Sequence, residues 1–224
     1  MTIIVAIDGP AGSGKSSVSR EVAKRVGFGY LDTGAAYRAL TWWALDRHLD
    51  PGDTEAVDGL LEDFPYKISL DPNRAAVSVG GVDITEAIRE PRISLLVSFV
   101  AGNKNVRDWM RDNARELVAK SGMLGVVAEG RDLTTVVFPE ADSRILLTAS
   151  EAVRIKRRSV ESAAGSLSET VVSVSDRDKK DSSVADFMEP APGVTLVDSS
   201  ELDLEQTVAA VMNTMALDGV GSNV

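Results

Sequence analysis

The sequence predicts an α/β fold in which helices cover both faces of a five-stranded parallel sheet. Five short apolar runs alternate along the chain with stretches of helical periodicity, as expected when strands are joined by crossover helices. A glycine-rich octapeptide directly follows the first apolar run. The 224 residues can bury a full core, so we expect one domain with small insertions rather than two domains.

The expected strands are short and mostly apolar, as is typical of strands buried on both faces. They lie at Ile3–Ile7, Phe28–Leu31, Gly125–Ala128, Arg144–Thr148 and Val194–Val197. The expected helices lie at Ser16–Val26, Ala35–Arg47, Val106–Lys120, Ser150–Arg158 and Leu204–Met215. Ligands of such folds bind at the carboxyl ends of the strands. Polar clusters occur at three of these ends, namely Asp8-Gly9, Asp32-Thr33-Gly34 and Glu129-Gly130-Arg131-Asp132.

Two stretches interrupt the alternation of strands and helices. Between Glu62 and Arg92, β-like runs at Tyr66–Leu70 and Ala75–Val79 are separated by the turn residues Asp71-Pro72-Asn73, which predicts a small inserted β-rich lobe. The second stretch, from Ser159 to Ser175, is rich in Ser, Ala, Val and Glu and lies between two basic clusters. Its composition fits either a mobile flap or a surface helical hairpin.

The octapeptide matches the P-loop pattern G-x-x-x-x-G-K-[ST] in its expected setting between a strand and a helix. It reads Gly9-Pro10-Ala11-Gly12-Ser13-Gly14-Lys15-Ser16. Its glycines allow the tight turn that points backbone N–H groups at phosphate oxygens, and the following helix adds its positive dipole end. In such a loop Lys15 reaches the β- and γ-phosphates of a nucleoside triphosphate, and the Ser16 hydroxyl is a ligand for Mg²⁺.

Composition excludes several other classes of protein. A net charge of −10 argues against coating nucleic acid or anionic membranes, since both need a broad basic face. No apolar run approaches the ~20 residues of a membrane span, and the N-terminus has no signal-peptide layout. The absence of cysteine excludes disulfides, zinc–thiolate sites and thiol catalysis. We therefore expect a cytoplasmic protein with no nucleic-acid or membrane partner.

Arginines beyond the loop predict a second anionic ligand. Arg38 follows Asp32-Thr33-Gly34 by one turn, and Arg154, Arg157 and Arg158 share one helical face by their spacing. Arg89, Arg107 and Arg131 lie near predicted element ends, and Arg177 comes later in the chain. A phosphate acceptor is already an anionic nucleophile, so it needs charge neutralisation and alignment rather than a general base. Several arginines, with His48 as the only histidine, suit that demand.

At this point the chain resembles the bacterial cytidylate kinases, which are nucleoside monophosphate kinases. The resemblance runs through Ile7–Ser17, Tyr30–Arg38 and Glu129–Asp132, and it spans almost the whole chain. It continues with Thr135–Ala141, Leu147–Ser150, the three arginines of the 154–158 helix, Arg177-Asp178 and Asp181. The β-rich lobe is similar to the enlarged monophosphate-binding insert of that family.

The resemblance implies the reaction ATP + CMP or dCMP to ADP + CDP or dCDP, with Mg²⁺. It also implies a monomeric P-loop domain whose three-layer α/β/α core comprises residues 1–60, 93–153 and 184–224. An NMP-binding insert would cover about 61–92 and a lid about 154–183.

The resemblance also assigns roles to individual residues. For ATP they are residues 9–17 of the loop and Arg157, and the catalytic set is Lys15, Arg131, Arg154, Arg158 and Arg177. For CMP they are Thr33, Arg38, Arg89, Ser98, Arg107, Arg131, Asp132, Arg177 and Asp181. The metal ligands would be Ser16 and, through water, Asp32, although Asp32 is equally well placed to be a helix cap.

Three positions depart from the family pattern. Thr134 replaces the usual Gly, Val184 replaces an Arg, and Asp186–Pro190 stand where a Pro-Leu pair normally follows. These changes bear on the preference for CMP over UMP. Two alternatives to this family are another small-molecule P-loop kinase, such as a shikimate-type kinase, and a nucleotide-dependent switch or ATPase. The β-rich lobe disfavours the first, and the acceptor-side arginines disfavour the second.

Overall fold

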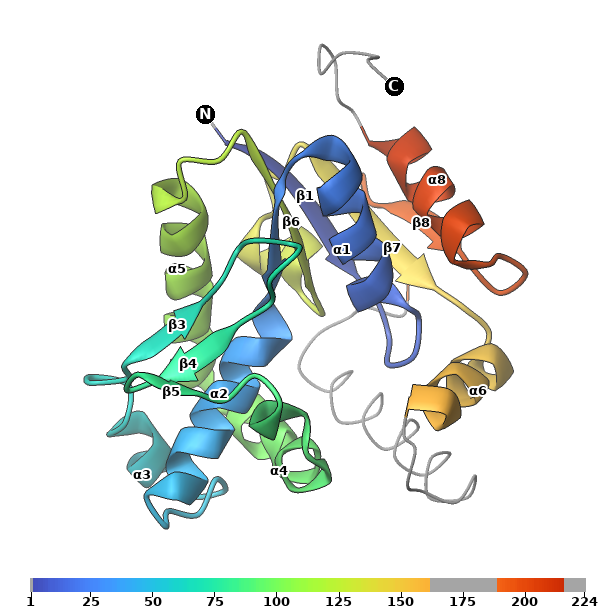
Figure 1. The fold of residues 1–224 in the computed structure, drawn as a ribbon. Helices are drawn as coiled ribbons and strands as arrows, with labels where there is room; N and C mark the ends of the chain where they lie inside the picture. Colours follow the sequence, from blue (N-terminus) through green and yellow to red (C-terminus); the bar gives the residue numbers. More distant parts are fainter. Residues whose placement is uncertain (1, 162–188, 216–224) are drawn as a thin grey trace.

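The computed structural model describes residues 2–161 and 189–215 of the chain (Figure 1). Its main sheet is parallel and five-stranded, in the order β2-β6-β1-β7-β8. The strands are β1 (Ile3–Asp8), β2 (Gly29–Asp32), β6 (Gly125–Gly130), β7 (Ser143–Thr148) and β8 (Thr195–Asp198). All five predicted strands are confirmed, with ends shifted by one or two residues. The first strand of the chain lies at the centre of the sheet.

Helices cover both faces of this sheet, as predicted. On one face, α1 (Lys15–Val26) and α8 (Leu204–Thr214) pack their apolar sides against β1, β6, β7 and β8 in one buried cluster. On the other face, α5 (Lys104–Lys120) packs against Ala6, Leu31 and Ala128. Successive residues of β1 thus contribute to opposite faces, because side chains alternate along a strand. The predicted helices are completed by α2 (Thr33–Asp46) and α6 (Glu151–Glu161).

The predicted β-rich lobe is also confirmed, as a small antiparallel sheet. Its strands are β3 (Tyr66–Ile68), β4 (Val77–Val79) and β5 (Val82–Asp83), in that spatial order. The β4–β5 turn uses Gly80 and Gly81 at φ values of 59° and 84°, which glycine adopts without strain. The sheet packs on α2, so its inner face joins a third buried cluster that includes Leu40, Val79 and Ile84.

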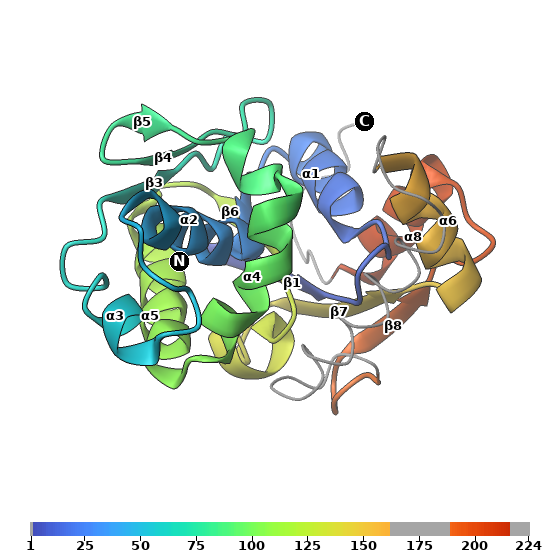
Figure 2. The ribbon, with the colours of Figure 1, turned by 90° about the horizontal axis from the view of Figure 1, so that it is seen from below.

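Four of the described helical segments were not predicted. They are α3 (Thr54–Asp58), a 3₁₀-helix at Ala87–Arg89, α4 (Pro91–Gly102) and a π-helix at Leu133–Val137. Helix α4 begins with Pro91 at its first position, where proline lacks only an N–H that would have no intrahelical partner. It packs along α2, and the two helices lie side by side in both ribbon views (Figures 1 and 2). Of the predicted acceptor-side arginines, Arg38 lies on α2, Arg107 on α5 and Arg89 at the end of the 3₁₀-helix.

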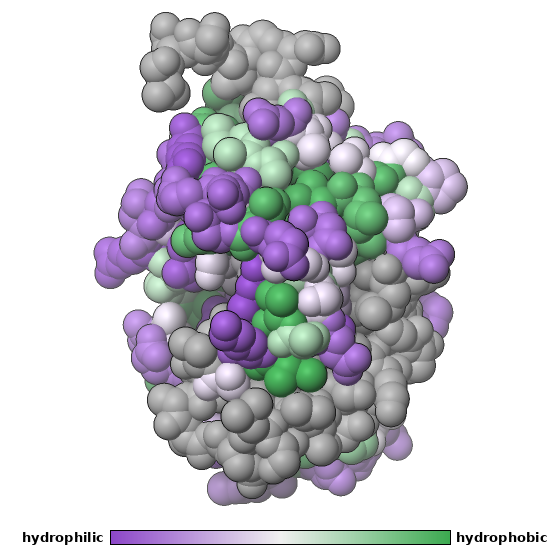
Figure 3. Space-filling view, turned by 90° about the vertical axis from the view of Figure 1, so that its right-hand side faces the viewer, coloured by the Kyte–Doolittle hydropathy of each residue, from purple (hydrophilic) through white to green (hydrophobic). Residues whose placement is uncertain are grey.

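The lobe and helix α6 lie on opposite sides of the P-loop region (Figures 1 and 2). On the side formed by α6 and α8, apolar side chains reach the surface between hydrophilic ones (Figure 3). The stretch Ser159–Ser175 lies outside the described residues, except for its first three, which end α6. No described helix is both long and apolar enough to cross a membrane.

Candidate active site

The P-loop connects the carboxyl end of β1 to the first turn of α1. Gly12 and Gly14 have φ values of 76° and 87°, so a side chain at either position would be strained. A Cβ atom on Gly12 would also come within 2.5 Å of the Arg154 carbonyl oxygen. Gly14 is the N-cap of α1, which leaves the first N–H groups of that helix available at the site. The loop therefore has the geometry of an anion-binding turn.

Lys15 and Ser16 both face Glu129, a buried carboxylate at the end of β6. The Ser16 hydroxyl donates to Glu129 Oε1 at 2.6 Å, and Lys15 Nζ lies 4.0 Å from Glu129 Oε2. The Tyr30 hydroxyl donates to the same carboxylate at 3.1 Å. Burial, and then repulsion from Asp32, raise the pKa of the Glu129 carboxyl, while Lys15, Ser16 and Tyr30 oppose that rise. Sequence reasoning quoted Glu129 only as part of a motif and missed this role.

Asp32 is a helix cap, which was one of its two predicted roles. Its Oδ1 accepts from Ala35 N at 3.0 Å, and its Oδ2 accepts from Arg89 at 3.0 Å. Asp32 and Glu129 are direct neighbours across the β2–β6 pair. With Ser16, they bring one hydroxyl and two carboxylates to the same edge of the sheet. No group of three or more His, Cys, Asp or Glu able to hold a metal occurs in the described ranges. These oxygens suit a cation that keeps part of its water shell, as Mg²⁺ does.

Three predicted arginines converge on the backbone of the P-loop. Arg131 donates to Gly9 O, Arg154 to Ala11 O at 3.0 Å, and Arg157 to Ser13 O at 3.2 Å. Arg154 is only 5% exposed. Arg157 also donates to the backbone and hydroxyl oxygens of Ser199, so it ties the loop to the end of β8. The side chain of Arg158, and all of Arg177, Asp181 and Val184, lie outside the described residues.

The predicted acceptor residues lie on the other side of the loop and are linked to one another. Arg107 of α5 donates to Asp132 Oδ2 at 2.8 Å, and Arg38 of α2 donates to the Ser94 hydroxyl at 3.1 Å. Thr33 donates to Glu129 O at 2.8 Å. Ser98 is partly buried one turn after Ser94 on α4. The structure thus places these residues on α2, α4, α5 and the segment after β6.

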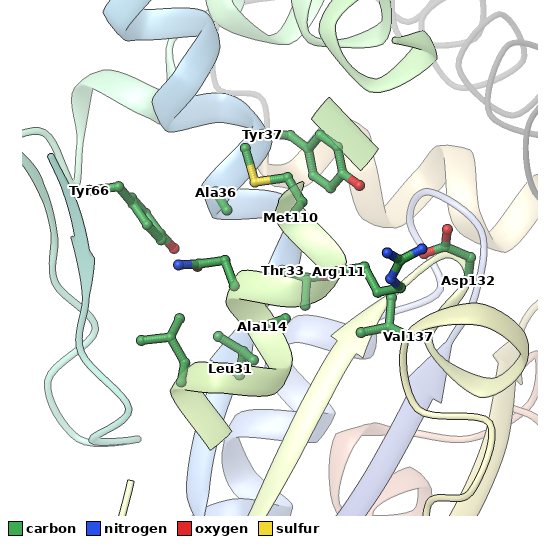
Figure 4. A pocket seen from close by; sticks show the side chains of 12 residues that line it. Leu31, Thr33, Ala36, Tyr37, Tyr66, Met110, Arg111, Ala114, Asp132 and Val137 are labelled. Atoms are coloured by element: carbon green, nitrogen blue, oxygen red, sulfur yellow. The ribbon is translucent and has the colours of Figure 1, made fainter. Parts of the chain in front are cut away.

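A surface pocket of about 340 Å³ opens beside the Arg107–Asp132 pair, and Tyr37 lies in its wall. A narrower pocket of about 20 Å³ shares Tyr37 and Asp132 with it. In this second pocket, Tyr66 of β3 faces inward from one side, while Asp132 and Val137 lie on the other (Figure 4). The inserted lobe and the segment after β6 therefore line opposite sides of a pocket that also includes Thr33, one of the residues predicted to bind CMP.

Asp8, at the end of β1, is a second buried carboxylate that sequence reasoning left without a role. It is 2% exposed and accepts from Leu133 N at 2.9 Å and from Thr134 N at 2.8 Å. The Thr134 hydroxyl adds a third hydrogen bond at 2.7 Å. Burial raises the pKa of the Asp8 carboxyl, and these hydrogen bonds oppose that rise. Thr134, the departure from the family's glycine, therefore points toward Asp8.

Comparison with known proteins decides between the alternatives that the motifs left open. Residues 5–217 match the family model described as cytidylate kinase. The chain belongs to the cytidylate kinase family. It is 41% identical over 214 residues to a cytidylate kinase of Cutibacterium acnes, covering 94% of this chain and 95% of that protein. The resemblance seen in the motifs is thereby confirmed, and the chain is an enzyme of this family rather than a nucleotide-dependent switch.

Further matches differ in length and in closeness. The chain is 41% identical over 218 residues to a bifunctional pantoate ligase/cytidylate kinase of a Synechococcus species. That match covers 93% of this chain but only 43% of the longer cyanobacterial protein. A solved structure of an uncharacterised protein from Eubacterium ventriosum is 10% identical and aligns with a TM-score of 0.51, over 95% of this chain and 97% of that chain. At that identity the structural match concerns the fold alone.

Proposed function

We propose that the enzyme transfers the γ-phosphoryl group of ATP to CMP and dCMP, giving ADP with CDP or dCDP. The observation that carries the proposal is the position of the Arg107–Asp132 pair. It lies at the same sheet edge as the P-loop, linked to it through Arg131 and Gly9. A donor site and an acceptor site side by side are what direct transfer between two bound nucleotides requires.

On the donor side, the loop N–H groups of residues 9–17 and the N-terminus of α1 bind the triphosphate. Lys15 stabilises charge on the transferring group. Arg131 and Arg154 are held by loop carbonyls, so their guanidinium groups are already beside the phosphates when ATP binds. Arg157 supports the same loop, and Arg158 and Arg177 complete the catalytic set that the family resemblance assigns.

Mg²⁺ fits the oxygen-bearing side chains at the end of β2 and β6. Ser16 would be its direct protein ligand, Asp32 would hold it through water, and Glu129 fixes the Ser16 hydroxyl at 2.6 Å. When bound with ATP, the ion neutralises charge on the β- and γ-phosphates.

On the acceptor side, Arg38, Arg89 and Arg131 would bind the phosphate of CMP. Thr33, Ser98, Arg107 and Asp132 would surround the cytosine, and Arg177 and Asp181 would contact the ribose. Asp132 accepts a hydrogen bond from the exocyclic amino group of cytosine, whereas uracil presents a carbonyl oxygen there. A buried acceptor left unpaired penalises the wrong base. We expect the 61–92 insert to carry the monophosphate side of the cleft and the 154–183 segment to be the lid.

The proposal is tested by ADP formation from ATP and Mg²⁺ with no acceptor, CMP, dCMP, UMP, AMP, GMP or shikimate in turn. We expect fast turnover only with the cytidine nucleotides and a monomer by size-exclusion light scattering. Turnover without an acceptor, or preference for another acceptor, would overturn the proposal. Omitting Mg²⁺ should abolish turnover, and recovery on adding it back separates metal dependence from loss of folded protein.

A further inference from the structure

The backbone after β6 turns sharply into the π-helix Leu133–Val137, and its first N–H groups need acceptors. Asp8 supplies them from another element, because it accepts from both Leu133 N and Thr134 N. The carboxylate of β1 thus acts as an N-terminal cap for a helix that begins 125 residues later. Asp132, the proposed base reader, is the residue directly before this capped turn.

Asp132 is therefore held on both of its sides. Its carbonyl oxygen accepts from Val136 N at 2.8 Å and from Val137 N at 3.1 Å, within the π-helix. The next two N–H groups along the chain are bound to Asp8. Its carboxylate, whose side chain is 17% exposed, is then left facing Arg107. Asp8 also adjoins Gly9, whose carbonyl accepts from Arg131. The first residue of the P-loop and the base reader are thus joined through short contacts, of which those of Asp8 are buried.

The Thr134 hydroxyl stands where the family pattern has a glycine, which carries no side chain. A glycine could donate its N–H to Asp8, but only a hydroxyl side chain adds the third hydrogen bond at 2.7 Å. Thr134 is 4% exposed, so the bond is shielded from water, and a bond to a charged acceptor is stronger than one between neutral groups. The side chain at position 134 therefore lies in the contact between β1 and the π-helix.

We propose that Asp8 and Thr134 form a positioning pair that fixes Asp132 for reading the acceptor base. Neither residue contacts the substrates. They act on specificity through the backbone of the turn. The Thr134 hydroxyl gives the Asp8 carboxylate a third hydrogen bond, which the family's glycine could not supply. This inference rests on the proposed role of Asp132 in cytosine recognition.

The test compares Thr134→Val, which keeps the shape and removes the hydroxyl, with Thr134→Ser, which keeps the hydroxyl. Thr135→Val is the matched control, because it makes the same change one residue on at an exposed position. Values of kcat and KM are measured for CMP, UMP and ATP with each variant and with the unmodified enzyme. Thr134→Ala is included in case valine disturbs packing, and a thermal melt reports stability for every variant.

In Thr134→Val we expect kcat/KM for CMP to fall about three- to tenfold, because a displaced Asp132 aligns the base less well. The value for UMP should change less, so discrimination narrows, and KM for ATP should stay within about twofold. Thr134→Ser should restore discrimination, and Thr135→Val should leave it unchanged. A lower melting temperature with unchanged discrimination in both Thr134→Val and Thr134→Ala would make the pair purely structural and overturn the inference. Absence of CMP turnover in the unmodified enzyme would instead overturn the proposed function.

Discussion

The proposed donor side and the proposed acceptor side are built in different ways. The centre of the donor side is one continuous segment, the P-loop, which offers backbone N–H groups and whose Gly12 and Gly14 lie in the left-handed region. The acceptor side is assembled from side chains on α2, α4, α5 and the segment after β6. Several of those side chains are paired with one another, as in Arg107–Asp132 and Arg38–Ser94.

Because of this difference, the two sides select their ligands in different ways. A backbone cradle recognises phosphate whatever nucleoside carries it, because N–H groups contact only the phosphate oxygens. A pre-formed ion pair must be rearranged or shared when a base enters, and a base that cannot replace the lost contacts is penalised. We therefore expect mutations on the donor side to reduce turnover with every acceptor, and mutations on the acceptor side to change which acceptor is used.

The largest effect is expected for Lys15→Ala. Removing this ammonium takes away charge stabilisation of the transferring phosphoryl group, so kcat should fall by about 10³-fold with CMP and with dCMP alike. Lys24→Ala, an exposed lysine on the same helix, is the control and should keep full turnover. Circular dichroism verifies folding. Near-normal turnover of folded Lys15→Ala would refute the donor-side assignment.

A smaller, selective effect is expected for Asp132→Ala. Without the carboxylate, cytosine loses its acceptor, and the ratio of kcat/KM for CMP over UMP should fall by about tenfold or more. KM for ATP should change little, since Asp132 faces Arg107 rather than the P-loop. Asp108→Ala is the matched control, because Asp108 lines the same 340 Å³ pocket and is paired to Arg111. An unchanged ratio in Asp132→Ala would remove its role in base reading.

Two tyrosines whose hydroxyl groups are shielded from water extend the comparison to stability. The Tyr30 hydroxyl donates to Glu129 on the donor side, so Tyr30→Phe should lower the free energy of unfolding by about 1–3 kcal/mol. The Tyr66 hydroxyl, in the inserted lobe, is buried with no hydrogen-bond partner among the residues that the structure describes. Tyr66→Phe should therefore leave stability unchanged or raise it by about 1 kcal/mol. Urea unfolding at neutral pH measures the free energy of unfolding of both variants. Equal losses in the two variants would contradict the different roles given to the two hydroxyl groups.

The smallest expected effect is a fall in the free energy of unfolding at alkaline pH. Burial raises the pKa of Tyr30, Tyr37 and Tyr66 above the ordinary value of 10.0. Above that value the unfolded chain loses protons that the folded chain retains, so the free energy of unfolding falls as pH rises. Urea unfolding between about pH 9 and pH 11 should show this fall, and Tyr66→Phe should show a shallower one. Identical slopes would mean that Tyr66 titrates alike in both states.

The sequence predicted the parts of the fold whose signals are local, and it missed the parts that depend on distant residues. The strands and the P-loop were predictable because their signals lie within a few consecutive residues. Helix α4 was missed because its sequence, Pro91–Gly102, is mainly apolar without a clear polar stripe, and because its first two residues were assigned to the lobe and the rest to the core without a helix. The π-helix was missed because Thr and Val favour strands and because its caps come from afar, namely Asp8 at one end and Arg115 at the other.

The roles of Glu129 and Asp8 could not be predicted for a related reason. Both depend on strand register, in which Ile7 lies beside Glu129 and Asp8 beside Gly130. No local pattern encodes a pairing between positions so far apart. Asp32 shows the intermediate case, since a helix cap is a local signal but its ion pair with Arg89 is not.

The central position of β1 also bears on how the protein is made. Its partners begin at Gly125 and Ser143, so β1 is synthesised well before either of the strands that pair with it. At typical translation rates that interval is on the order of ten seconds. During it the apolar run Ile3–Ile7 is exposed, and long-range parallel pairing is slow to form. We expect the nascent chain to engage chaperones early and to complete its sheet late.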